Sequence, residues 1–458
     1  MRSLLWPAVS LLAYVALRLL PPMAGLGDPS QAVLGVMLAG TVLWMSEAVP
    51  LGVAALVVIV LLAINPGLRL SDALQGFTSE VTFFLVGVTA IGTAVEASGL
   101  AQRAARFLAA SACSSPARLY AQMIVSLPAL AFLVPSAITR NAILIPAYRE
   151  ALETMGVTKS GRVGRALMLA LGMLNPLASS ALLTGGIASI AAATLLGGFS
   201  WLRWFVLMAV PYYALIFLGG LYLRLMVGRF EQGVGKKIGG PMPHKRLSPA
   251  ELKTLAVLAF TAILWLTDAW HRLSPAIPAL IAAIVLLIPR LGGLSWKQFE
   301  GKLSWSLILT VGASMSLART MIDSGAASWL GGLLASGLIG LTDSPMLLIA
   351  LLVIAVALVH LAITNLAACM AILIPIAVTV AEAAHLNPLV CGLVVTLAVD
   401  GIILYPVQTA ANLLAYESGY FQTSDVRRLG LGMLVLTVVV SLSVLPYWSL
   451  LAVPLAKP

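Results

Sequence analysis

Charge is scarce in this chain. Asp, Glu, Lys and Arg make up 10% of the 458 residues, and 60% of the residues are apolar. Soluble domains carry roughly 25% charged residues, so this composition excludes a soluble globular protein. Alternating strands of about ten residues, typical of a membrane β-barrel, are missing as well. Apolar segments of about 17 to 25 residues recur instead, each long enough to cross a bilayer as a helix. We therefore predict an all-α, polytopic membrane protein.

Cysteine and catalytic motifs are also nearly absent. The three cysteines, Cys113, Cys369 and Cys391, lie in apolar surroundings without CxxC or metal-ligand spacing, as small buried side chains do. The sequence contains no HExxH, no GxSxG and no Walker-type phosphate loop. It therefore predicts no catalytic residue, no enzyme, no cofactor and no ATP-driven step.

The positive charge is spread over short loops. The net charge is +10, but Lys and Arg do not gather in one basic domain, so nucleic acid is not an expected partner. Part of the excess follows the positive-inside rule, and part attracts anions. The expected partners are membrane lipid and a small anionic substrate.

The chain contains two weak copies of one unit. Leu43–Glu47 returns as Leu264–Asp268, and Glu96–Gly99 returns as Ile322–Gly325. The run Ala-Ile-Leu-Ile-Pro begins at Ala142 and occurs again later in the chain. Such repeats are typical of secondary transporters, which bind substrate where the copies meet at mid-membrane.

The pattern predicts about eleven transmembrane helices and two re-entrant hairpins. Basic clusters flank 119–155 on both sides, and only a hairpin places both clusters on one face of the membrane. We expect the N-terminus in the cytoplasm and a bacterial inner (plasma) membrane as the location. The predicted regions are 1–30, an extra N-terminal transmembrane helix; 31–225, the first repeat with the cytoplasmic-side hairpin 119–155; 226–252, a cytoplasmic linker; and 253–458, the second, inverted repeat with the outer-side hairpin 346–385.

The first hairpin is predicted to turn at a polar tip. Non-helical backbone is tolerated at membrane depth only in protein or beside a watery cavity. The helix that follows points its N–H groups and dipole at a bound anion. The candidate substrate residues at this tip are Ser136, Thr139, Arg140 and Asn141.

Arg140 is unusual, because a buried cation is costly unless it is paired or hydrated. Three roles stay open: clamping a substrate carboxylate or sulfate, replacing a coupling cation, or pairing with an acid such as Asp400. Asp400 itself is predicted to bind a cation or proton, or to pair with an internal cation.

The second tip and two interrupted helices complete the candidate site. Unwound helices expose carbonyl oxygens suited to a small cation, and their N-termini face an anion. Further substrate candidates are Thr364, Asn365, Thr184 and Thr409; the cation-binding candidates, with sodium as the possible ion, are Ser136, Gly185, Ala188, Asn365, Asp400, Pro406 and Asn412.

Three stretches resemble the divalent anion:sodium symporter family, across nearly the whole chain. Trp44–Leu51 is similar to its Trp-x-x-Ser/Thr-Glu-Ala-x-Pro segment, and Thr184–Ala188 resembles its first broken helix. Tyr405–Asp425 resembles its Pro-x-x-Thr-x-x-Asn…Gly-Tyr-x-x-x-Asp stretch. The resemblance implies a homodimer that carries dicarboxylates, tricarboxylates or sulfate, usually with sodium, by moving one domain against a fixed scaffold.

The tips depart from that family's Ser-Asn-Thr triplets. Only Ser136 keeps its place in the first, and the second reads Thr364-Asn365-Leu366. This departure leaves sodium-independent exchange open beside cation-coupled transport. A cation/proton antiporter or an oxyanion exporter of the same superfamily also stays open because of Asp400. A channel is disfavoured by inverted hairpins that meet mid-membrane.

Overall fold

The computed structural model describes residues 2–46, 48–111, 115–231, 246–339, 344–362 and 366–456. Every regular element in these ranges is a helix, apart from one bridge between Leu386 and Ala456. The predicted all-helical fold is confirmed for this part of the chain.

The first half contains α1 (Arg2–Leu19), α2 (Asp28–Ser46), α3 (Leu51–Ala63), α4 (Leu70–Leu74), η1 (Gln75–Thr78), α5 (Glu80–Ser98), α6 (Leu100–Ser111), α7 (Pro116–Leu133), α8 (Ala137–Thr154), α9 (Arg162–Met173), α10 (Asn175–Ser180), α11 (Ile187–Leu195) and α12 (Trp201–Val227). The second half contains α13 (Pro249–Leu266), α14 (Asp268–His271), α15 (Ala276–Leu287), α16 (Trp296–Lys302), α17 (Trp305–Asp323), α18 (Ala326–Ile339), α19 (Pro345–Ala362), α20 (Leu366–Ala383), α21 (Pro388–Gly401), η2 (Pro406–Gln408), α22 (Ala410–Tyr416), α23 (Thr423–Ser443) and α24 (Leu445–Leu450).

Several of these helices suit a bilayer by length and composition. Six spans of at least 18 residues are apolar enough to cross it, and shorter apolar helices accompany them. The protein is therefore a multi-pass membrane protein. The six long spans are Glu80–Ser98, Pro116–Leu133, Trp201–Val227, Pro249–Leu266, Trp305–Asp323 and Thr423–Leu450.

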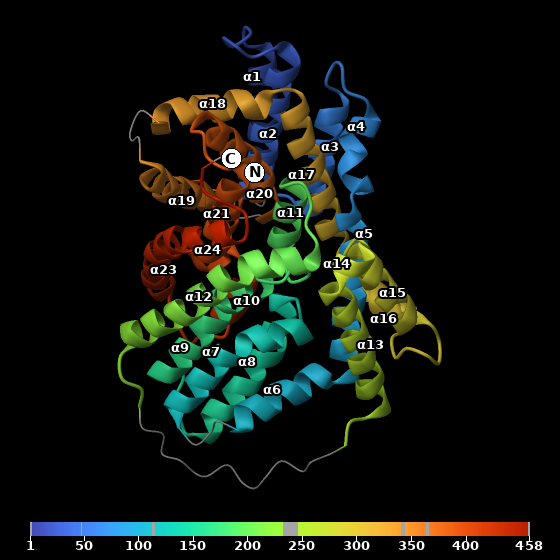
Figure 1. Ribbon diagram of the computed structural model, residues 1–458, viewed down its shortest axis with the longest axis vertical. Helices are drawn as coiled ribbons and strands as arrows, with labels where there is room; N and C mark the ends of the chain where they lie inside the picture. Colours follow the sequence, from blue (N-terminus) through green and yellow to red (C-terminus); the bar gives the residue numbers. More distant parts are fainter. Residues whose placement is uncertain are drawn as a thin grey trace.

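The helices pack in two groups (Figure 1). In the first group α5 packs on α13, α15 and α17, and α3 packs on α2 and α17. In the second group α21 packs on α19, α20 and α23, and α22 packs on α8 and α9. Contacts of α6 with α8, and of α17 and α18 with α20, join the groups.

The two copies of the repeated unit share their order of elements. A long helix (α5 or α17) is followed by a shorter one (α6 or α18), then by a helix pair, a broken helix and another long helix. Gly99 ends α5 and Gly325 follows α17, with positive φ angles of 81° and 80° that favour glycine. The helices α6 and α18 run across the long axis at opposite ends of the molecule (Figure 1).

The predicted breaks lie close to where the sequence placed them. The first hairpin segment is α7 and α8, and the second is α19 and α20. The first of the two predicted interrupted helices, the one with Thr184, Gly185 and Ala188, corresponds to α9, α10 and α11. One detail differs: Thr139, Arg140 and Asn141, which were predicted at the polar tip, lie inside α8, because this helix already begins at Ala137 with Ser136 as its cap. The helices α6 and α18 were not predicted.

Candidate functional site

The first tip is closed by a hydroxyl cap. The Ser136 side chain accepts a hydrogen bond from the Thr139 backbone N–H at 3.3 Å, and another from the Thr139 hydroxyl at 3.1 Å. A serine cap satisfies only part of the first turn, so other N–H groups of α8 are left to face a ligand. Thr139, Arg140 and Asn141 therefore lie in the first turn of α8 rather than in a loop.

Arg140 is enclosed by oxygen atoms. Its Nη1 donates to the carbonyls of Val134 and Pro135 at 2.6 and 2.9 Å. Its Nε donates to the Asn175 amide oxygen at 2.7 Å, and Nη2 donates to the Asn175 carbonyl at 2.7 Å and the Ser179 hydroxyl at 2.8 Å. These bonds use all five N–H donors of the guanidinium, and the side chain is 1% exposed. In this conformation no Arg140 donor is left for a substrate, so direct contact with substrate stays a prediction.

Asp400, the acid that the sequence suggested as a partner of Arg140, is bonded to another residue. Among the described residues, Asp400 accepts a hydrogen bond from the Tyr212 hydroxyl at 2.6 Å and forms no ion pair with Arg140. The neutral oxygens around Arg140 compensate for lost hydration but do not cancel its charge. A positive charge thus remains behind the N-terminus of α8, where it adds to the helix dipole.

Asn141 joins the first tip to the second broken helix. Its side-chain amide donates to the carbonyls of Leu171 and Ala411, both at 2.9 Å. Its oxygen accepts a hydrogen bond from the Asn175 amide at 2.8 Å. One amide therefore connects α8, α9, α10 and α22, and it brings Asn412 close to the tip.

Asn412 is buried and partly unsatisfied. It is fully buried, and among the described residues its Oδ1 has no hydrogen-bond partner. The Thr409 hydroxyl caps α22 by accepting from the Asn412 N–H at 3.3 Å, and Pro406 begins η2 just before it. An unpartnered amide oxygen at a helix break fits a small cation, which prefers oxygen ligands.

The first break is shaped by a close backbone contact. A Cβ on Gly185 would lie 1.8 Å from the Ser179 carbonyl oxygen, so only glycine fits there. The Thr184 hydroxyl accepts a hydrogen bond from the Trp201 indole at 3.3 Å, and Ala188 is buried in α11. In this conformation the hydroxyl of Thr184 is thus bonded to α12 rather than to the tip.

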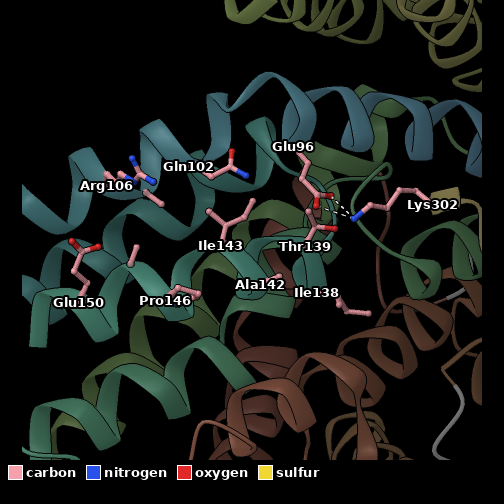
Figure 2. A pocket seen from close by; sticks show the side chains of 12 residues that line it. Glu96, Gln102, Arg106, Ile138, Thr139, Ala142, Ile143, Pro146, Glu150 and Lys302 are labelled. Atoms are coloured by element: carbon pink, nitrogen blue, oxygen red, sulfur yellow. Dashed lines mark hydrogen bonds and ion pairs between the residues drawn. The ribbon is translucent and has the colours of Figure 1, made fainter. Parts of the chain in front are cut away.

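A cavity of about 420 Å³ reaches the first tip (Figure 2). Gln102 and Arg106 of α6 form one wall, and α8 forms the other. Thr139 lies at one end, beside the ion pair in which Lys302 Nζ contacts Glu96 at 2.8 Å. The lining residues are Glu96, Gln102, Ala105, Arg106, Ile138, Thr139, Ala142, Ile143, Pro146, Ala147, Glu150 and Lys302.

Some predicted residues cannot be placed, and others were not predicted. Thr364 and Asn365 lie outside the described residues. Asn175 and Ser179 were recognised only as polar residues of a broken helix, and their role as partners of Arg140 depends on the packing of α8 against α10. Nothing in the sequence singled out Gln102 or Arg106, because arginines near membrane ends are common.

The apolar spans define a multi-pass membrane protein. The chain belongs to the sodium:sulfate symporter family, because the model of that family's transmembrane region matches residues 2–453.

The relatives that match most of the chain include two transporters with named substrates. The sodium-dependent dicarboxylate transporter SdcS of Staphylococcus saprophyticus is 24% identical, over 91% of this chain and 85% of that protein. The L-tartrate/succinate antiporter of Escherichia coli is 27% identical, over 93% and 94%. The solved structure of the Alcanivorax borkumensis YdaH transporter has a TM-score of 0.58 over 84% of this chain and 88% of that chain, at 17% identity, which shows a similar fold.

Proposed function

We propose that this protein is a secondary carrier of small divalent and trivalent anions, namely dicarboxylates, citrate or sulfate. The observation that carries the proposal is the uncompensated charge of Arg140, buried directly behind the N-terminus of α8. A fixed positive charge and a helix N-terminus act on an anion in the same sense. The cavity between α6 and α8 offers an anion a route to Thr139.

The oxygens around Arg140 support exchange without sodium. Three backbone carbonyls, one amide oxygen and one hydroxyl converge on the guanidinium. Oxygens of these kinds also coordinate small cations in transporters. We propose that Arg140 supplies a permanent cation at the first tip, so that no sodium ion is needed there. The relative named a tartrate/succinate antiporter is consistent with exchange.

Sodium-coupled symport is the second candidate, favoured by Asn412. Its Oδ1 is buried and has no hydrogen-bond partner among the described residues, so it offers an oxygen ligand to a cation at the second break. The relative named as a sodium-dependent dicarboxylate transporter is consistent with this possibility. The cation would then be a co-transported substrate, with Asn412 and the backbone near Pro406 as its ligands.

We further propose the arrangement in the membrane. The pairs α7–α8 and α19–α20 are re-entrant hairpins of inverted repeats. The second group of helices, which contains α21 and α22, moves as an elevator against the first group, which contains α5 and α17. Two copies of the chain form a homodimer. The N-terminus lies on the cytoplasmic side of a bacterial inner membrane, as the basic loops favour.

Transport in proteoliposomes tests these proposals. Uptake of labelled succinate, citrate and sulfate is measured with and without an inward sodium gradient, and with and without trapped internal anion. Exchange predicts uptake that requires internal anion and ignores sodium. Sodium-driven net uptake would instead favour the Asn412 site, and the failure of every anion to move would refute the carrier.

A matched pair of variants on one helix links transport to the tip. Thr139→Val removes the hydroxyl that bonds Ser136, and we expect uptake to fall about tenfold or more. Thr154→Val removes a hydroxyl at the far end of α8 whose one hydrogen bond among the described residues is to the Glu150 carbonyl, and we expect uptake to be unchanged. Equal effects of both substitutions would contradict a site at the tip.

A further inference from the structure

The cavity between α6 and α8 contains a cation that no other described residue engages. Arg106 lines it, and the described part of the chain gives its side chain neither a hydrogen bond nor an ion pair. Its neighbour Arg103 differs, because Arg103 Nε contacts Glu251 Oε1 at 2.6 Å and Nη2 contacts Oε2 at 2.9 Å. Arg103 thus anchors α6 to α13, whereas Arg106 is available to a ligand.

A second polar side chain stands beside Arg106. Gln102 lies one helical turn earlier on α6, so both side chains lie on the same face. The Gln102 Oε1 atom is buried with no hydrogen-bond partner among the described residues. The Nε2 atom at the other end of the same carboxamide carries two N–H donors, and no described residue accepts a hydrogen bond from them. Arginine and a side-chain amide together can bind one carboxylate through several N–H groups.

The charges of the cavity differ between its two ends. Lys302 is neutralised by Glu96 at the end near Thr139, with Nζ 2.8 and 3.0 Å from the two carboxylate oxygens. Arg106 and Glu150 lie on opposite walls at the other end, without an ion pair between them (Figure 2). Glu150 therefore opposes an anion that Arg106 attracts, and it limits how tightly the anion is held there.

We infer that Arg106 and Gln102 form an anion subsite, at which a small dicarboxylate docks by one carboxylate before it reaches the tip at Thr139 and Ser136. The inference rests on the proposed carrier function and adds a specificity-determining pair to it. A cavity of about 420 Å³ lies within the range of small-molecule sites. Arg106 attracts the dicarboxylate into the cavity, and Glu150 weakens its binding there so that it can move on to the tip.

Two substitutions of opposite sign test the subsite. Arg106→Gln removes the attracting charge, and we expect the KM for succinate to rise about three- to tenfold with little change in maximal rate. Glu150→Gln removes the opposing charge, and we expect the KM to fall about two- to threefold. Both shifts should shrink between about 0.01 M and 0.1 M salt, because the screening length falls from ~30 to ~10 Å. A role of Arg106 in stability alone, or in lipid contact, predicts no gain in affinity from Glu150→Gln.

Arg427→Gln is the matched control, because Arg427 is an exposed arginine of α23 that does not line the cavity. Unaltered melting temperatures establish that each variant is folded. If wild type transports and Arg106→Gln behaves like Arg427→Gln, the subsite is refuted and the carrier stands.

Calorimetric titration of succinate into the purified protein separates the two proposals. If no anion is transported but succinate binds and Arg106→Gln weakens its binding, the carrier function fails and the subsite survives. If no anion is transported and none binds, both are refuted.

Discussion

Arg140 shows how a protein interior can hold a full charge without an ion-pair partner among the described residues. Its neighbours are neutral, but each presents an oxygen at 2.6 to 2.9 Å, so that the guanidinium exchanges hydration for five hydrogen bonds. Asn175 supplies two of these oxygens, one from its side chain and one from its backbone. The charge survives, and the anion site that we propose at the tip depends on its attraction.

Removal of this guanidinium should leave a cage that sodium can enter. We expect Arg140→Ala to lower stability by about 2–4 kcal/mol, because buried oxygens lose charge-assisted hydrogen bonds. Transport should fall at least tenfold. Added Na⁺ should raise the melting temperature of the variant but not that of wild type, because carbonyl and hydroxyl oxygens are sodium ligands. Thermal unfolding in detergent, with choline as the control cation, measures both effects.

A sodium response of equal size in wild type and Arg140→Ala would show that the ion binds elsewhere, and Asn412 would be the first place to look. No response in either protein would mean that the oxygens around Arg140 do not form a cation cage.

At the scale of elements, the first broken helix depends on one glycine. The turn between α10 and α11 brings the Gly185 backbone against the Ser179 carbonyl, so a methyl group at residue 185 cannot be accommodated without moving the chain. Ser179 is also a partner of Arg140, with its hydroxyl 2.8 Å from Nη2. The shape of the break and the cage around the guanidinium are therefore mechanically linked.

We expect Gly185→Ala to reduce stability by about 1–3 kcal/mol, as overpacking does, and to reduce transport at least tenfold. Gly92→Ala is the control, because a Cβ at residue 92 in α5 meets nothing within 4 Å. Alanine favours helix over glycine, so Gly92→Ala should be neutral or slightly stabilising. Uptake assays and melting curves of both variants measure the difference between them. A Gly185→Ala variant with wild-type uptake would show that the turn does not shape the site.

The start of α9 is held by a carboxylate from beyond α12. The Arg162 N–H donates to the two carboxylate oxygens of Glu231, at 2.9 and 3.0 Å. Partial burial raises the pKa of Glu231, but hydrogen bonds from the Arg162 backbone and the nearby guanidinium outweigh it, so that the pKa lies below its ordinary value. A lowered pKa in the folded state means stability that is present above the ordinary carboxyl pKa and is lost as the pH falls through the lower one.

Glu231→Gln should therefore lower the melting temperature slightly at pH 7, because a charged helix-terminal interaction is worth about 0.3–1 kcal/mol. The difference from wild type should shrink as the pH falls below the ordinary carboxyl pKa, and it should vanish once the pH has passed the lowered pKa of Glu231. Glu300→Gln, at an exposed position of α16, serves as the control. A difference that persists unchanged at low pH would show that packing, rather than charge, is responsible.

For the whole molecule, the orientation of the two helix pairs decides whether the repeats are inverted. The α7–α8 pair is flanked by Ser115 and Lys159, and the loop between α3 and α4 contains Arg69. If the pair is re-entrant, its two ends lie on one face of the membrane and Arg69 lies on the other.

Single cysteines at these positions, in a variant without Cys113, Cys369 and Cys391, test this arrangement. An impermeant maleimide applied from one side of sealed vesicles should label residues 115 and 159 together, and residue 69 only from the opposite side. Labelling of residues 115 and 159 from different sides would mean that α7 and α8 do not form a re-entrant hairpin.

The sequence by itself determined most of the long helical segments and where they break, although it did not predict α6 and α18. Apolar length and local Pro, Gly and Ser residues act within one turn, so the pairs α7–α8 and α19–α20 and the interrupted helices follow from local chemistry. The repeat indicated a transporter for the same reason, because its order is written along the chain.

Only the tertiary structure decided what the polar residues do. Arg140 contacts Asn175, which lies 35 residues later in the sequence, and Asn141 contacts Ala411, which lies 270 residues later. A local sequence pattern cannot predict contacts between residues so far apart in the chain. The same packing separated Asp400 from Arg140, and it left Arg106 alone among the described cations of the α6–α8 cavity without a partner. Charge and helix are local properties of a sequence, whereas the partner of a charge depends on how the helices pack.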